Sequence, residues 1–135
     1  MTTTSATASS RLKGIAPQFV VGDVVRAAEH YRDTLGFTIV DYFGDPPVFA
    51  IVSRDGVEIH FGKRDTGSIV PNRTVRGDGL DAYIWVEDLH ALAHELQARG
   101  ATILEGPVTR IYGMRELIVA DDNGYRLAFG ESAAP

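Results

Sequence analysis

The fold is decided by VGDVVRAAEHYRDTLGF, residues 21–37, because VEDLHALAHELQARGA, residues 86–101, repeats its plan. Each stretch opens on a short acidic turn, continues as an amphipathic helix and closes on a glycine. Gly36 and Gly100 lie 64 residues apart, and Val86 follows Val21 by 65. Self-similarity at a nearly constant spacing indicates a duplicated structural unit.

The first unit has the pattern of one helix followed by a hairpin-connected sheet. Asp23 is a predicted helix N-cap, and the apolar residues after it recur at helical spacing as far as Leu35. Gly36 then supplies the left-handed residue that ends the helix. Strands are predicted at residues 18–21, 38–43, 48–53 and 57–62, which gives the order β-α-β-β-β.

The second unit repeats this order after a polar, glycine-containing linker. Its helix is predicted at residues 88–99 and its strands at 81–86, 102–105, 115–120 and 125–129. The last hairpin turns at Gly124, 68 residues after the corresponding Gly56. The predicted fold class is therefore α+β, with two tandem β-α-β-β-β modules that form a curled mixed sheet. We expect one domain over residues 15–131, made of module 1 (15–63), a linker (64–79) and module 2 (80–131), after a disordered tail at residues 1–14.

Composition narrows the classes of function. A chain of 135 residues with 44% hydrophobic content is long enough for one packed domain. It contains no cysteine, which excludes disulfides and thiolate chemistry, and we expect a cytoplasmic protein. A net charge of −5 disfavours a nucleic-acid partner, and no apolar run approaches the roughly 18 residues that a membrane span needs.

Several short motifs, taken in order, carry a family resemblance. Together they resemble the glyoxalase, bleomycin-resistance and extradiol-dioxygenase superfamily, also called the vicinal oxygen chelate superfamily, over about residues 15–131. The resemblance implies sheets that curl into cups and a homodimer, while one fold of this kind hosts many functions. The motifs are VGD (21–23), HY (30–31), LGF (35–37), GVEIHF (56–61), YGMRE (112–116), DDNGY (121–125) and FGE (129–131).

The resemblance also implies where a metal would bind. Enzymes of the superfamily carry ligands on the first and last strands of each module, and these positions fall here on Ala16, His60, Asp81 and Ala128. Methyl groups offer no lone pair, and catalytic metal sites normally keep three protein ligands. We therefore expect no metal and no cofactor, as in the bleomycin-resistance-like members. The alternative ligand set is His60, Asp81 and Gln18, since residues two apart share a strand face.

An aromatic and acidic cleft is predicted around the fifth strand. Asp81, Tyr83 and Trp85 alternate along it, so their side chains point to one face, where they either line the cleft or fill the core. Tyrosine, tryptophan and a carboxylate suit a planar or cationic organic ligand.

Further residues are expected around this cleft. His60 is predicted to be a pocket histidine oriented by Glu58. Tyr42, Phe49 and Tyr112 are candidates for the rim of the cleft.

Arg115 and Glu116 complete the set of candidate residues. Adjacent residues of a regular strand face opposite sides, so one of the two looks into the cleft. Arg115 there would favour an anionic ligand and Glu116 a cationic one. Arg115 is kept as a candidate ligand-binding residue, with a salt bridge across the sheet, for example to Glu105, as the structural alternative.

Three functions follow from these observations. The first is a metal-free protein, related to antibiotic resistance, that sequesters an antibiotic-like small molecule without transforming it. The second is a metal-dependent lyase, isomerase or dioxygenase that uses His60, Asp81 and Gln18. The third is a metal-independent enzyme with His60 as general base. We favour the first and assign no catalytic residue. Pairing of the modules within one chain or between two remains open at this stage.

Overall fold

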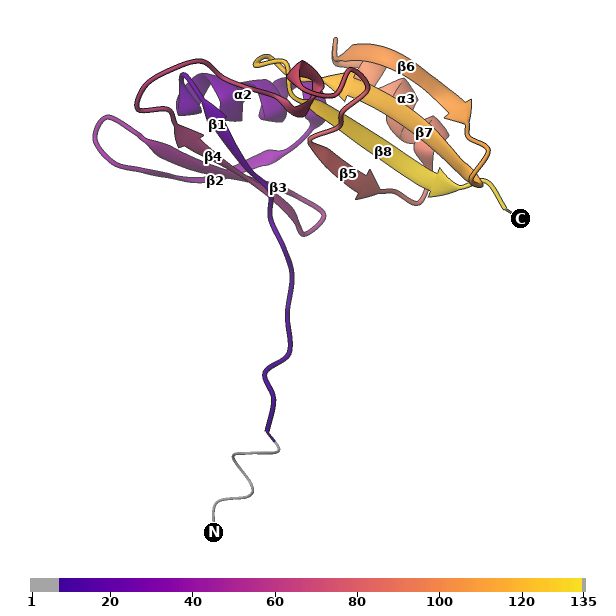
Figure 1. Cartoon of the computed structure of the whole chain (residues 1–135), viewed down its shortest axis with the longest axis horizontal. Coiled ribbons are helices and arrows are strands. Elements are labelled where there is room, and N and C mark those ends of the chain that lie inside the picture. The colour runs from indigo at the N-terminus through magenta and orange to yellow at the C-terminus, as the bar shows by residue number, and fades with distance from the viewer. Residues whose placement is uncertain (1–7, 135) are drawn as a thin grey trace.

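A computed structural model describes residues 8–134 of the chain, and it contains two four-stranded sheets, each with one helix (Figure 1). The first module runs β1 (Gln18–Val21), α2 (Val24–Leu35), β2 (Thr38–Phe43), β3 (Phe49–Arg54) and β4 (Val57–Lys63). The second runs β5 (Ala82–Trp85), α3 (Leu89–Ala98), β6 (Thr102–Thr109), β7 (Met114–Ala120) and β8 (Arg126–Ser132).

Both sheets have the same topology. The strand orders are β1-β4-β3-β2 and β5-β8-β7-β6, with the first and last strand of each module paired in parallel and the other pairs antiparallel. The predicted α+β fold with two tandem β-α-β-β-β modules is thus confirmed. A short 3-10 helix, η1 (Asn72–Thr74), lies in the segment between the modules. The predicted disorder of residues 1–14 falls in part on residues 1–7, outside the described residues.

The helix ends follow from local chemistry. The Asp23 carboxylate accepts hydrogen bonds from the backbone N–H groups of Val25 and Arg26, both at 3.1 Å, and so satisfies donors that the first helical turn leaves free. Gly36 ends α2 with φ of 74°, a left-handed conformation that glycine adopts without steric cost. In the second module Asp88 caps α3 through the N–H of Ala91.

Two strands run further than predicted, since β6 continues past Glu105 and β8 continues past Phe129. The sequence predicted a strand at residues 102–105, whereas β6 continues through Gly106 and Pro107 to Thr109. Its pairing with β7 shifts register between Glu105 and Val108. Such an irregularity accommodates proline, which has no N–H to donate to the ladder.

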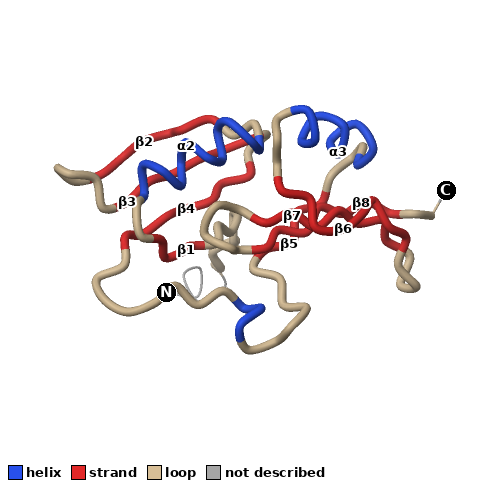
Figure 2. Tube along the Cα trace, turned by 90° about the horizontal axis from the view of Figure 1, so that it is seen from above, coloured by secondary structure: helices blue, strands red, loops and turns tan. Residues whose placement is uncertain are grey.

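Each sheet has one covered face and one open face. Ile59 and Phe61 of β4 are fully buried on the α2 side, and Leu117 and Val119 of β7 are fully buried in the same hydrophobic core on the α3 side. Both helices lie on the same side of the strand layer (Figure 2). We call the opposite side of each sheet its open face. Several large apolar side chains stay exposed beside or on these faces, among them Val20, Phe43, Trp85 and Tyr112.

Contacts across the module boundary join the two units into one core. The ring of Tyr125 stacks on Phe19 with centroids 4.5 Å apart. The buried Tyr31 hydroxyl donates to Asp121 at 2.7 Å, between α2 and the loop before β8. Within the described residues, no helix is long and apolar enough to cross a membrane.

Candidate functional site on the open face of the second sheet

A buried carboxylate marks the open face of the second sheet. Glu116 lies on β7, where Leu117 and Val119 point towards α3, so strand alternation directs Glu116 to the opposite side. Its exposed fraction is only 2%. A buried ionised group is costly unless it is paired and hydrogen-bonded, so its partners decide whether it is tolerated.

Three side chains donate hydrogen bonds to this carboxylate. The Tyr112 hydroxyl lies 2.7 Å from Oε1 and the Tyr83 hydroxyl 2.8 Å from Oε2. Arg110 Nε donates to Oε1 at 3.0 Å, and its two terminal nitrogens donate to Glu105 at 2.7 and 3.2 Å. We call these five residues the Glu116 cluster. It holds two carboxylates and one guanidinium, so its formal charge is negative.

The backbone of β8 makes room for the cluster at a glycine. Gly130 is the strand partner of both Glu116 and Trp85. A Cβ atom at Gly130 would overlap the phenol of Tyr83, which lies across this position to reach Glu116. Any side chain here would therefore displace Tyr83.

The cluster shifts the pKa values of its members in opposite directions. Burial would raise the pKa of Glu116, but the hydrogen bonds from Tyr112, Tyr83 and Arg110 outweigh it and hold the pKa below the ordinary value. Burial, followed by the hydrogen bond to Glu116, raises the pKa of Tyr83 to about 12. Glu116 is therefore ionised and Tyr83 protonated at neutral pH.

A cavity of about 870 Å³ lies beside the cluster, within the size range of small-molecule sites. One wall is the open face of the second sheet, with Arg110, Tyr112 and Glu116, and another is the segment between the modules. Among the described residues that line it, Arg126 is the one guanidinium with no carboxylate at salt-bridge distance.

An aromatic pair extends the site towards the edge of the sheet. Tyr83 and Trp85 lie with ring centroids 5.1 Å apart, and Trp85 is 74% exposed. The predicted alternation of these two residues on one face agrees with this geometry, and they do not fill the core. An exposed indole next to a buried carboxylate offers a flat ligand a stacking surface and a negative charge.

The open face of the first sheet brings together three other predicted residues. His60 Nε2 lies 2.7 Å from Glu58 Oε1, as the sequence suggested, and the ring of Phe49 meets the His60 ring edge-on with centroids 5.5 Å apart. Gln18 is the strand partner of His60 on β1. This group is more open to solvent than the Glu116 cluster, since the Glu58 side chain is half exposed.

Asp81, Tyr42 and Arg115 lie elsewhere than the sequence placed them. Asp81 accepts hydrogen bonds from the backbone N–H groups of Asn72 and Arg126, both at 2.9 Å. Its side chain therefore connects the segment between the modules with the start of β8. Tyr42 packs against the core on the helix side rather than at the rim. Arg115 pairs with Glu131 at 3.0 Å instead of Glu105, and Glu116 is the residue that faces the open side.

The donor set does not fit a metal centre of the kind that the superfamily implies. His60 is bonded to Glu58, and both carboxylate oxygens of Asp81 are taken by backbone N–H groups. Within residues 8–134, no three histidine, aspartate or glutamate side chains lie close enough together to hold a metal ion.

Sequence reasoning missed two members of the site. Arg110 lies beyond the end of the strand predicted at residues 102–105 and was given no role, and Glu105 was considered only as a structural partner of Arg115. Glu116 was considered only as one of two alternatives. The run of apolar residues after it does not fix its orientation, because Ile118, which shares the face of Glu116, is as apolar as Leu117 and Val119.

Comparison with known proteins agrees with this architecture. Residues 15–129 match the family described as the Glyoxalase/Bleomycin resistance protein/Dioxygenase superfamily, and the chain belongs to this superfamily. Among curated proteins, none matches the chain significantly.

Solved structures show the same fold at low sequence identity. A glyoxalase/bleomycin resistance protein/dioxygenase from Nocardioides is 19% identical, with a TM-score of 0.67, and the match covers 96% of this chain and 89% of that one. TioX from Micromonospora sp. ML1 is 18% identical, with a TM-score of 0.70 and coverages of 89% and 98%. A superfamily member from Sphaerobacter thermophilus is 21% identical, with a TM-score of 0.71 and coverages of 90% and 98%.

Proposed function

We propose that this protein binds a planar or cationic, antibiotic-like small molecule on the open face of the second sheet, without a metal and without transforming it, as a bleomycin-resistance-like member of its superfamily. The observation that carries the proposal is the Glu116 carboxylate, which is buried, held ionised and placed beside a cavity of about 870 Å³. A cytoplasmic location remains part of the proposal and rests on the absence of cysteine.

The chemistry of the cluster supports a binding role. The two carboxylates of the cluster outnumber its one guanidinium, so a cation that lies directly against the cluster meets an excess of negative charge in a partly desolvated place, where charge interactions are strong. The cavity lining as a whole is formally neutral, because it also contains Arg76, Arg126 and Asp78. Trp85 and Tyr83 offer aromatic faces next to that charge. Phenols that already donate to Glu116 hold the carboxylate in place, so little ordering is needed when the ligand binds.

A homodimer is the second part of the proposal. Val20 and Phe43 of the first sheet and Trp85 of the second are large apolar side chains that stay about half exposed or more. The open faces are not covered by the chain's own helices (Figure 2). A second copy that packs against these faces would bury this surface and close the cavity from the open side.

The test is calorimetric titration with two probes, metal-free bleomycin and the planar cation acriflavine, with neutral acridine at pH 7.5 as the uncharged comparison. We expect binding of at least one cationic probe that weakens about tenfold or more in Glu116→Gln, since a charged hydrogen-bond acceptor contributes about 1.5–3 kcal/mol. Glu131→Gln is the matched control, because this carboxylate pairs with Arg115 on the other side of the sheet. Absence of binding by both cations, or equal loss in the two variants, would contradict the proposal.

A second candidate function is metal-independent catalysis on the first sheet. The observation in its favour is the 2.7 Å contact between His60 Nε2 and Glu58, which orients the imidazole as a general base requires. Turnover that disappears in His60→Gln, with ligand affinity unchanged, would support it. Binding with no turnover would favour the first candidate.

A further inference from the structure

The cavity beside the Glu116 cluster is neutral as a whole, but its charges are separated. The cluster contributes two carboxylates and one guanidinium, so this end of the cavity has an excess of negative charge. Arg76 and Asp78 of the segment between the modules lie 3.1 Å apart, and this exposed pair adds no net charge. The positive charge that balances the cluster therefore belongs to Arg126.

The Arg126 guanidinium has donors to spare. It lies at the start of β8 and is partly buried, and its Nη1 donates to the Gly77 carbonyl at 3.3 Å. Within residues 8–134, its side chain makes no other hydrogen bond and no salt bridge. A guanidinium presents five N–H donors in a planar fork that matches a carboxylate. Arg126 can therefore bind an anionic group without giving up a carboxylate partner.

The register of the second sheet sets the separation of the two charged ends. Arg126 pairs with Ala120 of β7, which follows Glu116 by four residues on the same strand. This offset is roughly 13 Å along the strand, at about 3.3 Å per residue. Ile118 and its strand partner Ala128 lie in the row between the two ends, and both are apolar. The open face thus leads from a carboxylate, over an apolar middle, to a guanidinium.

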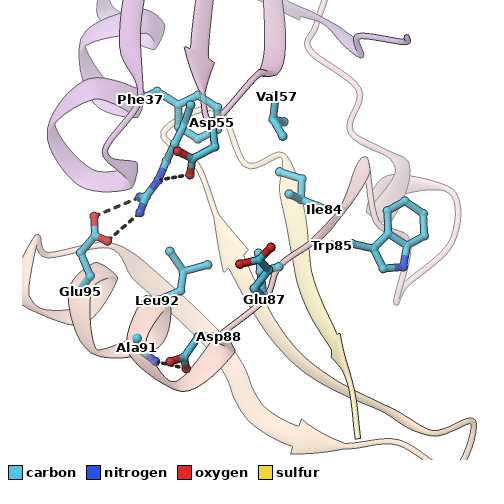
Figure 3. A pocket seen from close by; sticks show the side chains of 12 residues that line it. Phe37, Asp55, Val57, Ile84, Trp85, Glu87, Asp88, Ala91, Leu92 and Glu95 are labelled. Atoms are coloured by element: carbon cyan, nitrogen blue, oxygen red, sulfur yellow. Dashed lines mark hydrogen bonds and ion pairs between the residues drawn. The ribbon is translucent and has the colours of Figure 1, made fainter. Parts of the chain in front are cut away.

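A second cavity, of about 590 Å³, has no such arrangement. It lies between the modules, and its polar lining is acidic, with carboxylates from Asp55, Glu87 and Asp88 (Figure 3). Arg54 is the one cation among its lining residues, and its guanidinium already donates to Glu95 at 2.7 and 3.0 Å. The opposed charges are therefore a property of the cavity beside the Glu116 cluster.

We propose that Arg126 binds a carboxylate of the ligand, so that the ligand is a zwitterion with its cation against the Glu116 cluster and a flat apolar middle over Ile118. This inference rests on the ligand site proposed above and narrows the ligand class from a cation to a zwitterion. An unpaired guanidinium opposes a simple cation in the same cavity, whereas a zwitterion pairs with both ends.

The test compares two probes that share a cation and differ in the anion. The zwitterion 4′-(aminomethyl)biphenyl-4-carboxylate carries its charges at opposite ends of two aromatic rings, and the corresponding carboxamide has the same shape with the cation alone. Both are titrated calorimetrically into the full chain, beside metal-free bleomycin and acriflavine. We expect the carboxylate to bind about tenfold more tightly than the carboxamide, because hydrogen bonds between ionised groups are the strong ones.

Three variants separate the charge of Arg126 from its contact with Gly77. Arg126→Gln should weaken binding of the carboxylate about tenfold and change that of the carboxamide less than about twofold. Arg126→Lys keeps the charge and should retain part of the preference. Arg73→Gln is the matched control, since Arg73 also joins the segment between the modules to the second module, through the Gly124 carbonyl at 3.1 Å, but does not line the cavity. It should leave both affinities unchanged.

The remaining outcomes overturn the inference. Equal affinities of the two biphenyls, equal loss of both in Arg126→Gln, or the same selective loss in Arg73→Gln would show that Arg126 binds no anion of the ligand. Binding of bleomycin or acriflavine without the biphenyl carboxylate has the same consequence, and in that case the proposed cation site stands. Failure of all four probes to bind overturns the zwitterion and the proposed function together.

Discussion

The two open faces occupy equivalent places in the repeat and yet differ in chemistry. Gly62 of β4 and Gly130 of β8 occupy equivalent positions in the two modules. Each is paired in the sheet with one residue of the neighbouring antiparallel strand. That neighbour is Phe49 in the first sheet and Glu116 in the second. A duplicated backbone therefore places an aromatic ring and a buried carboxylate at the same point of the scaffold. Function is set by a few positions, while the scaffold stays constant.

The largest expected difference between the two faces is in stability. Glu116→Ala removes a carboxylate that three side chains donate to, and we expect it to lower the free energy of unfolding by about 2–3 kcal/mol. Glu58→Ala removes the half-exposed partner of His60 and should cost less than about 1 kcal/mol. Urea unfolding of both variants measures the contrast. Equal losses would mean that burial does not distinguish the two faces.

Substitution of the two equivalent glycines, Gly130 and Gly62, gives a second comparison of the two faces. Gly130→Ala forces a Cβ into the phenol of Tyr83, and we expect a loss of about 1–3 kcal/mol with the Tyr83 contact to Glu116 broken. Gly62→Ala is the matched control, since nothing lies within 4 Å of a Cβ at that position. It should change the unfolding free energy by no more than about 0.5 kcal/mol in either direction. Thermal unfolding of the two variants gives the answer, and a neutral Gly130→Ala would contradict the geometry.

The pH dependence of the free energy of unfolding measures the contribution of the ionised Glu116 side chain. The pKa of Glu116 is lowered in the folded protein, so its contribution is fully present above the unfolded value of about 4.3 and is lost as the pH falls through the folded pKa. We therefore expect the stability difference between the unmodified protein and Glu116→Gln to be constant from pH 7 to about 5 and to shrink below pH 4. Urea unfolding at several pH values measures it. A difference that grows on acidification would show that the pKa is raised instead.

The smallest expected effect is a spectroscopic one. The chain has five tyrosines, and the pKa of Tyr83 is raised to about 12 by burial and by its hydrogen bond to Glu116. Absorbance of tyrosinate in an alkaline titration should therefore show a late component that moves to lower pH in Glu116→Gln. Tyr83→Phe identifies that component by removing it. If Glu116→Gln leaves the titration unaltered, the pKa of Tyr83 does not depend on the Glu116 carboxylate.

Most of the fold could be predicted because its signals are local. The helix bounds followed from Asp23, Gly36 and the apolar spacing between them, and the caps form as expected. The end of β6 could not be predicted, because Pro107 has the appearance of a terminator and only pairing with β7 shows that the strand continues. Strand continuity depends on a distant partner, which a local pattern does not contain.

The candidate site was less accessible to sequence reasoning than the fold. Tyr83 and Trp85 were placed on the correct face, since alternation along a strand is a local property. Arg110 was overlooked because its role depends on meeting Glu116 and Glu105 across a hairpin. Asp81 was taken for a cleft residue, whereas backbone N–H groups from two distant segments engage both of its oxygens.

The sequence by itself determined the duplication, the helix caps and the order of the strands. These properties depend on residue type and on spacing along the chain, which one strand or one helix already contains. Only the tertiary structure decided that Glu116 faces the open side with Tyr83, Arg110 and Tyr112 around it, and that a separate acidic cavity lies between the modules. The reason is physical: a buried charge is tolerated only where several segments bring donors to it, and their meeting is a property of the packed chain.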